Sequence, residues 1–124
     1  MKAPLLLATL ISLTICVPAY AYETTTGAVM ICDTQKQVER YVQLFDGDPQ
    51  VAIHTVNTEE NNPNACALVD VSYVEGPEVG MARSTSYAFR IVPIAVVGVN
   101  TSRGYGPVKP ALFFMPIKID ELAV

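Results

Sequence analysis

The residues of this chain with the clearest capacity for chemistry are its three cysteines, Cys16, Cys32 and Cys66. Cys32 ends an apolar segment that is typical of a buried strand, and Cys66 begins a second such segment. Cys16 lies in a predicted leader, so two thiols remain in the processed chain, and in an oxidising compartment they are expected to pair. The sequence therefore predicts a Cys32–Cys66 disulfide. A redox pair would use Cys-x-x-Cys at a helix start, a spacing that these cysteines do not have.

Catalytic and metal-binding chemistry have few candidate residues. His54 is the only histidine, no Gly-x-Ser-x-Gly motif provides a serine nucleophile for it, and two Cys with one His fall short of four zinc ligands. Asp33, Asp70 and Glu75 lie near predicted strand ends, where carboxylates could converge. The oxygen-rich segment 57–62 does not have the spacing of an EF-hand loop. We expect no metal, no cofactor and no enzyme activity, and we keep a small hydrolase as the least favoured alternative.

A glycine-flanked segment is the best candidate for recognition. Asn100 to Pro107 reads as a hairpin loop that carries Arg103 and Tyr105. Arg and Tyr often anchor interfaces, loops often carry recognition, and Tyr105 fits no core pattern. The sequence predicts an interaction loop at Arg103 and Tyr105. A second candidate is the apolar run Phe113-Phe114-Met115, if one side of its strand is uncovered.

The first 21 residues have the pattern of a secretory signal peptide. Lys2 gives a positive start, 5–17 is apolar, and Ala19-Tyr20-Ala21 supplies the small residues needed for cleavage. The apolar run of about 13 residues is too short to span a bilayer, which takes about 20. We predict export to the periplasm or the exterior, with no stable membrane span. Lipidation of Cys16 is the alternative, although the residue before it is not the small one that this chemistry favours.

Length and composition predict one domain over 22–124. The chain has 124 residues, of which 51% are hydrophobic and 16% charged, as in globular proteins. The formal net charge is −4, and the basic residues are scattered along the sequence. A nucleic-acid partner needs a clustered basic face, so we expect none.

The predicted order of elements is one strand, two consecutive helices and then four strands. A strand over 27–32 is followed by a helix over about 34–46, for which Thr34 and Gln37 form a capping box. Asp48-Pro49 signals a second helix over about 49–58.

The second half of the chain is predicted to be strands. These cover 66–74, 79–83, 86–100 and 108–119, with Pro93 and Gly98 marking a bulge, a bend or an edge. The prediction is an α+β fold, a small antiparallel meander sheet with two helices packed on one face and one disulfide.

These features favour a non-enzymatic exported binding domain. Its partner would be another envelope protein or a small ligand. The alternative is a structural envelope protein that self-associates through a sheet edge or an apolar face, and the oligomeric state is left open.

Overall fold

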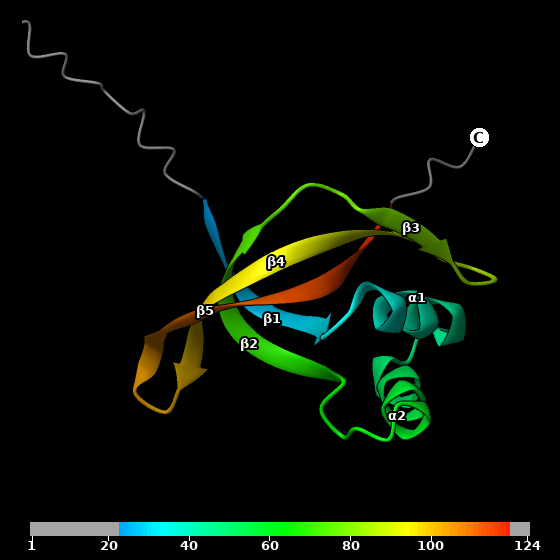
Figure 1. Ribbon diagram of the computed structural model, residues 1–124, viewed down its shortest axis with the longest axis horizontal. Helices are drawn as coiled ribbons and strands as arrows, with labels where there is room; N and C mark the ends of the chain where they lie inside the picture. Colours follow the sequence, from blue (N-terminus) through cyan, green and yellow to red (C-terminus); the bar gives the residue numbers. More distant parts are fainter. Residues whose placement is uncertain (1–22, 120–124) are drawn as a thin grey trace, which may run out of the picture.

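The computed structural model describes residues 23–119, so the predicted leader, Cys16 and residues 120–124 lie outside the described residues. The order of elements is the predicted one (Figure 1). They are β1 (Thr24–Cys32), α1 (Gln35–Leu44), α2 (Pro49–Glu59), β2 (Cys66–Glu75), β3 (Gly80–Arg83), β4 (Ala88–Thr101) and β5 (Gly104–Lys118). The α+β class is confirmed, with both helices at one end of a five-stranded antiparallel sheet.

Both helices begin at the predicted caps. The Thr34 hydroxyl accepts a hydrogen bond from the Gln37 amide at 3.2 Å, and the Gln37 side chain accepts one from the Thr34 amide at 3.0 Å. This reciprocal pair satisfies two amides that the first turn leaves without partners. The Asp48 side chain accepts from the Gln50 amide, with Pro49 at the first helical position. The first helix ends at Leu44, earlier than predicted, because the next residue is already extended.

The sheet is more complex than a meander. Its strand order is β2-β1-β5-β4-β3, and β2 also pairs with β4, so the sheet closes on itself. Consecutive strands pair at β1–β2, β3–β4 and β4–β5, as in a meander, but β2 pairs with β4 where a simple meander would pair it with β3. β2 can pair with β4 because β4 is long and curled. It has a bulge between Val96 and Gly98, and it is long enough to pair with both β2 and β5. Bulges increase the local twist of a strand, and the one at Gly98 was predicted.

The fold has two cores, one on each face of the curled sheet. The helix-side core contains Met30, Cys32, Val38, Tyr41, Val42, Ala52, Ile53, Val56, Cys66, Phe89 and Ile91. The inner core, enclosed by the strands, contains Ile31, Val71, Tyr73, Val92, Ile94, Val96 and Met115. Because side chains alternate along a strand, Phe114 packs against the helix-side core and Phe113 against the inner core. Both sides of β5 are therefore covered at the Phe113-Phe114 pair.

The predicted Cys32–Cys66 disulfide is confirmed. The two cysteines are directly opposite each other on β1 and β2, with Cα atoms 4.1 Å apart, and each is 1% exposed. They are 34 residues apart in sequence. The bond therefore closes a loop that contains both helices.

Candidate functional site

An apolar groove of about 300 Å³ lies on the outer face of the sheet, which is the face opposite the inner core. It is lined by Val74, Glu75, Gly76, Pro77, Pro93, Ile94, Ala95 and Leu112. The register brings three strands together here, because Val74 of β2 lies opposite Ala95 of β4, and Ala95 lies opposite Leu112 of β5. The groove thus depends on the pairing of strands that are far apart in sequence.

Small side chains leave space between larger ones in this groove. On β4, Ile94 is buried in the inner core, while the flanking Pro93 and Ala95 point to the outer face. Leu112 stands beside them with 74% of its surface exposed, the highest value among the large exposed hydrophobic residues. An exposed leucine is not unusual alone, but here it borders a continuous apolar surface.

The connection after β2 holds the other side of the groove in place. The Gly76 amide donates to the Pro93 carbonyl at 2.8 Å. A Cβ atom at Gly76 would lie 2.9 Å from the Pro93 ring, so only glycine lets the chain approach this closely.

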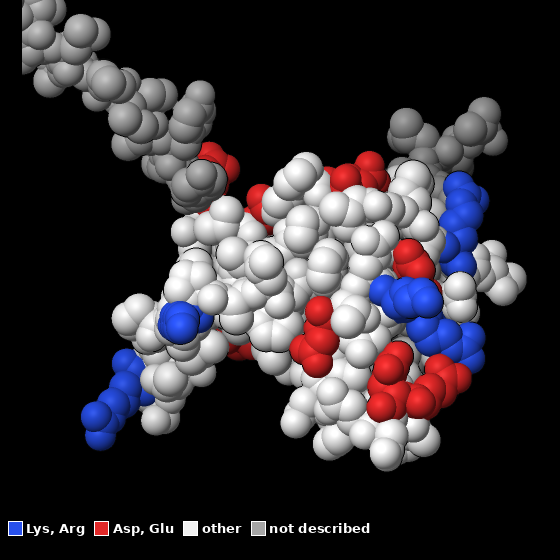
Figure 2. Space-filling model, viewed as in Figure 1, with Lys and Arg blue, Asp and Glu red and all other residues white. Residues whose placement is uncertain are grey.

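The groove carries little charge. Glu75 is its only ionisable lining residue, and its carboxylate lies 3.3 Å from the Arg90 guanidinium. Figure 2 shows Lys and Arg gathered near β3 and α1 at one end of the molecule and at the β4–β5 hairpin at the other, with acidic side chains between them. The groove is chemically suited to an apolar group.

The predicted interaction loop is much shorter in the structure. β4 continues to Thr101 and β5 starts at Gly104, so the loop boundaries of 100 and 107 were wrong, and the turn consists of Ser102 and Arg103. The hairpin can be this tight because Gly104 has φ +98°, a conformation that L side chains rarely adopt. Arg103 is exposed at the turn, as expected.

Tyr105 lies in β5 and is not part of a loop. It is 47% exposed, and its hydroxyl donates a hydrogen bond to one oxygen of the Asp70 carboxylate. Asn100, directly opposite Tyr105 in the register, donates to the other oxygen at 2.8 Å. These two bonds lower the pKa of Asp70, with the Tyr105 bond the larger cause, and the Asp70 carboxylate raises the pKa of Tyr105. Tyr105 thus fastens the hairpin to β2.

The three acids considered for catalysis do not pair with one another. Asp70 binds Tyr105 and Asn100, and Glu75 lies beside Arg90. Asp33 follows β1, and its amide donates to the Ala65 carbonyl.

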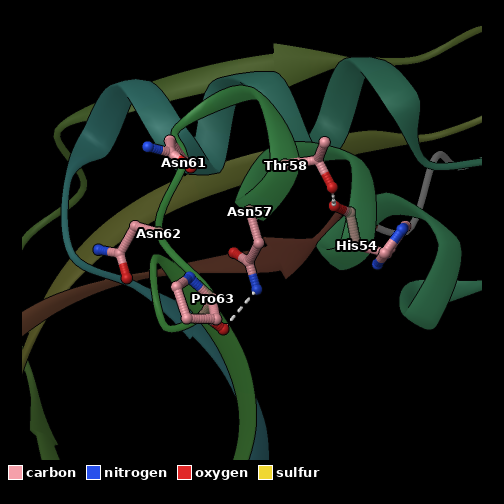
Figure 3. A pocket seen from close by; sticks show the side chains of 6 residues that line it. All are labelled: His54, Asn57, Thr58, Asn61, Asn62 and Pro63. Carbon is pink, nitrogen blue, oxygen red and sulfur yellow. Dashed lines mark hydrogen bonds between the residues drawn. The ribbon is translucent and has the colours of Figure 1, made fainter.

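A second hollow, of about 370 Å³, surrounds His54 (Figure 3). It is lined by His54, Asn57, Thr58, Asn61, Asn62 and Pro63. The Asn57 amide donates to the carbonyls of Pro63 and Cys66 and accepts from the Cys66 amide. The Thr58 hydroxyl donates to the His54 carbonyl at 2.8 Å. No serine or acid lines this hollow, and its Asn57 and Thr58 side chains serve the fold.

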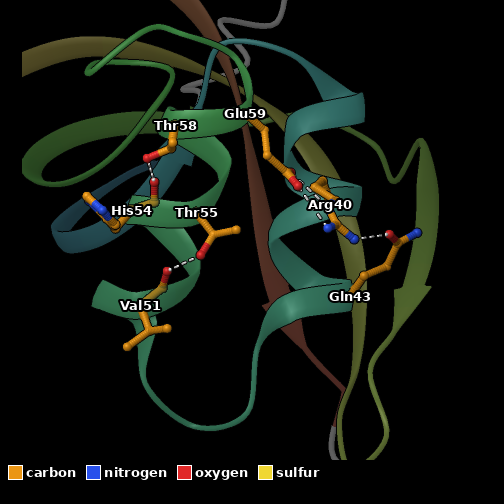
Figure 4. A network of polar contacts seen from close by, with 7 residues as sticks. All are labelled: Arg40, Gln43, Val51, His54, Thr55, Thr58 and Glu59. Atoms are coloured by element: carbon orange, nitrogen blue, oxygen red, sulfur yellow. Dashed lines mark hydrogen bonds and ion pairs between the residues drawn. The ribbon is translucent and has the colours of Figure 1, made fainter.

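The two helices are joined by one ion pair (Figure 4). Arg40 of α1 binds both carboxylate oxygens of Glu59 on α2, at 2.8 and 2.9 Å. This contact lowers the pKa of Glu59 and raises that of Arg40. Its place between two packed helices indicates a structural role.

The groove is not predicted from the sequence, although some of its residues lie in predicted strands. The sequence pattern marks Pro93 only as a bulge, a bend or an edge position, and Leu112 as part of a strand. The available signal was the alternation at Pro93-Ile94-Ala95, which gives one face of β4 small side chains. Its meaning depends on the register with Val74 and Leu112, which the sequence does not contain.

Within residues 23–119, no cluster of three or more His, Cys, Asp or Glu side chains is arranged to hold a metal ion. In the same range, no helix combines the length and the apolar character needed to span a bilayer.

No protein-family model matches the chain, and no curated protein or solved structure matches it either.

Proposed function

We propose that this chain is an exported, non-enzymatic binding domain whose outer groove holds an apolar segment of another exported protein. The observation that carries the proposal is the groove itself, an apolar depression of about 300 Å³ bordered by the 74% exposed Leu112. Such a volume is at the lower end of ligand sites, which suits a few apolar side chains. Exposed apolar surface of this kind commonly marks an interaction site.

Export is supported by two independent features. The sequence predicts a cleavable leader over 1–21, and the structure contains a disulfide, a bond that persists mainly in oxidising compartments. A periplasmic location fits both features, and the partner would then be an envelope protein.

The binding role is favoured over catalysis because the candidate catalytic groups have other partners. Asp70 and Glu75 are engaged by Tyr105 and Arg90. The hollow at His54 is lined by no serine, cysteine or acid, and its one hydroxyl, that of Thr58, is bonded to the His54 carbonyl. A hydrolase would need such groups to converge on one substrate position.

The proposal can be tested by photo-crosslinking in living cells. The full chain, expressed with its leader, would carry a photoreactive residue at position 112, in the groove. The matched control carries it at position 68, where Leu68 of β2 is also apolar and 46% exposed but does not line the groove. We expect a covalent product with one defined protein from position 112 only.

Two results would count against the proposal. Equal products from positions 112 and 68, or none from either, would mean that the groove does not select a partner. Attachment of a small molecule at position 112 would show that the ligand is not a protein. In each variant, the melting temperature checks that the domain remains folded.

A further inference from the structure

The two edges of β1 differ in how much of their length pairs with a neighbouring strand. On one side, β1 pairs with β2 along its whole length, from Thr24 opposite Val74 to Cys32 opposite Cys66. On the other side, its only partner among the described residues is β5, and they meet at one position, Cys32 opposite Phe114. Within the described range 23–119, most of this second edge therefore has no strand beside it.

The hydrogen-bond pattern shows which backbone groups point to the open edge. The Asp33 amide donates to the Ala65 carbonyl at 2.9 Å, so hydrogen bonds flank the Cys32–Cys66 pair and the pair itself is not hydrogen-bonded. The close Cα separation of 4.1 Å agrees with this. The β1–β2 register has no irregularity. The N–H and C=O groups of Thr24, Thr26, Ala28 and Met30 consequently point away from β2.

A proline explains why β5 does not continue along this edge. In the register of Cys32 opposite Phe114, the next position of this ladder would bring Met30 opposite Pro116. Pro116 has no N–H and cannot donate to the ladder. The pairing of β1 with β5 stops there.

The open edge of β1 also lacks the protective features that such edges usually carry. Prolines and charged side chains commonly block sheet edges against further pairing, and residues 24–32 contain neither. The side chains of Thr24, Thr25, Thr26 and Ala28 are exposed, and in Figure 1 the first half of β1 extends beyond the body of the domain. Threonine favours extended structure, so the outward backbone N–H and C=O groups of this segment can pair with another strand.

We propose that the open edge of β1 binds the same edge of a second copy, forming an antiparallel β1–β1′ pair across a two-fold axis. The segment is complementary to itself: centred on Thr26, the pairing places Thr24 opposite Ala28 of the partner and brings no two like charges together. The outward N–H and C=O groups of each copy then bond to those of the other, about six hydrogen bonds in all. An isologous contact of this kind closes at two copies.

This dimer is expected to be weak, because one strand pair buries less than the roughly 1,200 Å² typical of stable interfaces. Protein purified from cells that express the full chain, with its N-terminus determined by mass spectrometry, would be studied by sedimentation velocity. We expect the average mass to rise from monomer toward dimer between about 1 and 500 μM, the micromolar range of weak complexes. Hydrogen exchange of the outward amides of Thr24, Thr26 and Ala28 should slow over the same range.

Two variants at the centre of the pair test the geometry. Thr26→Pro removes the central donor and should weaken dimerisation at least about tenfold, whereas the matched control Thr26→Val keeps the N–H and should dimerise normally. Thr26→Lys places two like charges opposite each other, so its dimer should be lost at low salt and partly recovered at high salt. This second variant keeps the test valid if Thr26→Pro does not fold.

Three outcomes would overturn the inference. They are a monomer at 500 μM in which the amides of Thr24, Thr26 and Ala28 exchange freely, a monomer in which these three amides are protected by the chain itself, and a complex of β1 with a different protein. None of these depends on the apolar groove, so the proposed binding function stands or falls separately.

Discussion

The hydroxyl of Tyr105 and the amide of Asn100 both donate to the Asp70 carboxylate, so three strands meet at one ionised group. All three side chains are exposed. From the sequence, Tyr105 is a recognition candidate because it lies between two glycines, and Asp70 is a catalytic candidate because it lies near a predicted strand end. What the sequence did not contain was the register that places Asn100 and Tyr105 directly opposite each other beside β2. At this site the exposed side chains hold the hairpin in position.

The contact at Asp70 should make the β4–β5 hairpin sensitive to pH. The pKa of Asp70 is lowered, so its stabilising effect is complete above the ordinary carboxyl value and is lost as pH falls through the lower folded value. The pKa of Tyr105 is raised, so its effect is complete below the ordinary phenol value and is lost as pH rises through the higher folded value. We expect the protection factors of the hairpin amides, which correct the exchange rates for their intrinsic pH dependence, to be highest between these limits, as measured by NMR.

Tyr105→Phe and Asp70→Asn provide the matched comparison for this pH effect. Tyr105→Phe keeps the ring but removes the donor, and it should abolish the alkaline loss of protection. Asp70→Asn removes the charge and should abolish the acid loss. Wild-type pH profiles in both variants would show that the hairpin is held by other contacts.

At the scale of elements, the helices were more predictable than the strands. Thr34 with Gln37 and Asp48 with Pro49 are local signals, because the groups that they satisfy lie within one turn of helix. The end of β4 and the start of β5 were misassigned because the glycines there suggested a loop, whereas Gly104 makes a two-residue turn. Strand pairing depends on distant residues, which no local pattern records.

Asn57 joins α2 to the beginning of β2 through three hydrogen bonds to backbone groups. Asn57→Ala would leave the Cys66 amide without its partner, and we expect the free energy of unfolding to fall by about 1–3 kcal/mol. Asn64→Ala, in the exposed turn nearby, should change it by less than about 0.5 kcal/mol. Urea denaturation of both variants measures the difference, and equal midpoints would remove Asn57 as a structural link.

At the scale of the molecule, the disulfide and the closed sheet both stabilise the fold. The disulfide was predictable, because the processed chain is expected to retain two cysteines. The closure of β2 onto β4 was not, since it needs the bulge at Val97 of β4 and the length of that strand. The groove is a product of that closure, which is why it could not be predicted either.

Reduction should therefore destabilise the domain strongly. Closing a loop of this length removes about 3–4 kcal/mol of conformational freedom from the unfolded chain in the entropic description. We expect the urea midpoint to fall when dithiothreitol is added, and to fall equally in the Cys32→Ser, Cys66→Ser double variant without reductant. An unchanged midpoint on reduction would contradict a stabilising role for the bond.

The position of this disulfide also bears on the order in which the chain can mature. If the chain is exported N-terminus first, as we propose, both cysteines cross the membrane before any residue of β3, β4 or β5. The Cys32–Cys66 disulfide, which closes the segment that contains the two helices, can therefore form while the rest of the chain is still crossing the membrane. β3, β4 and β5 would then pack against an N-terminal half in which the disulfide has already formed.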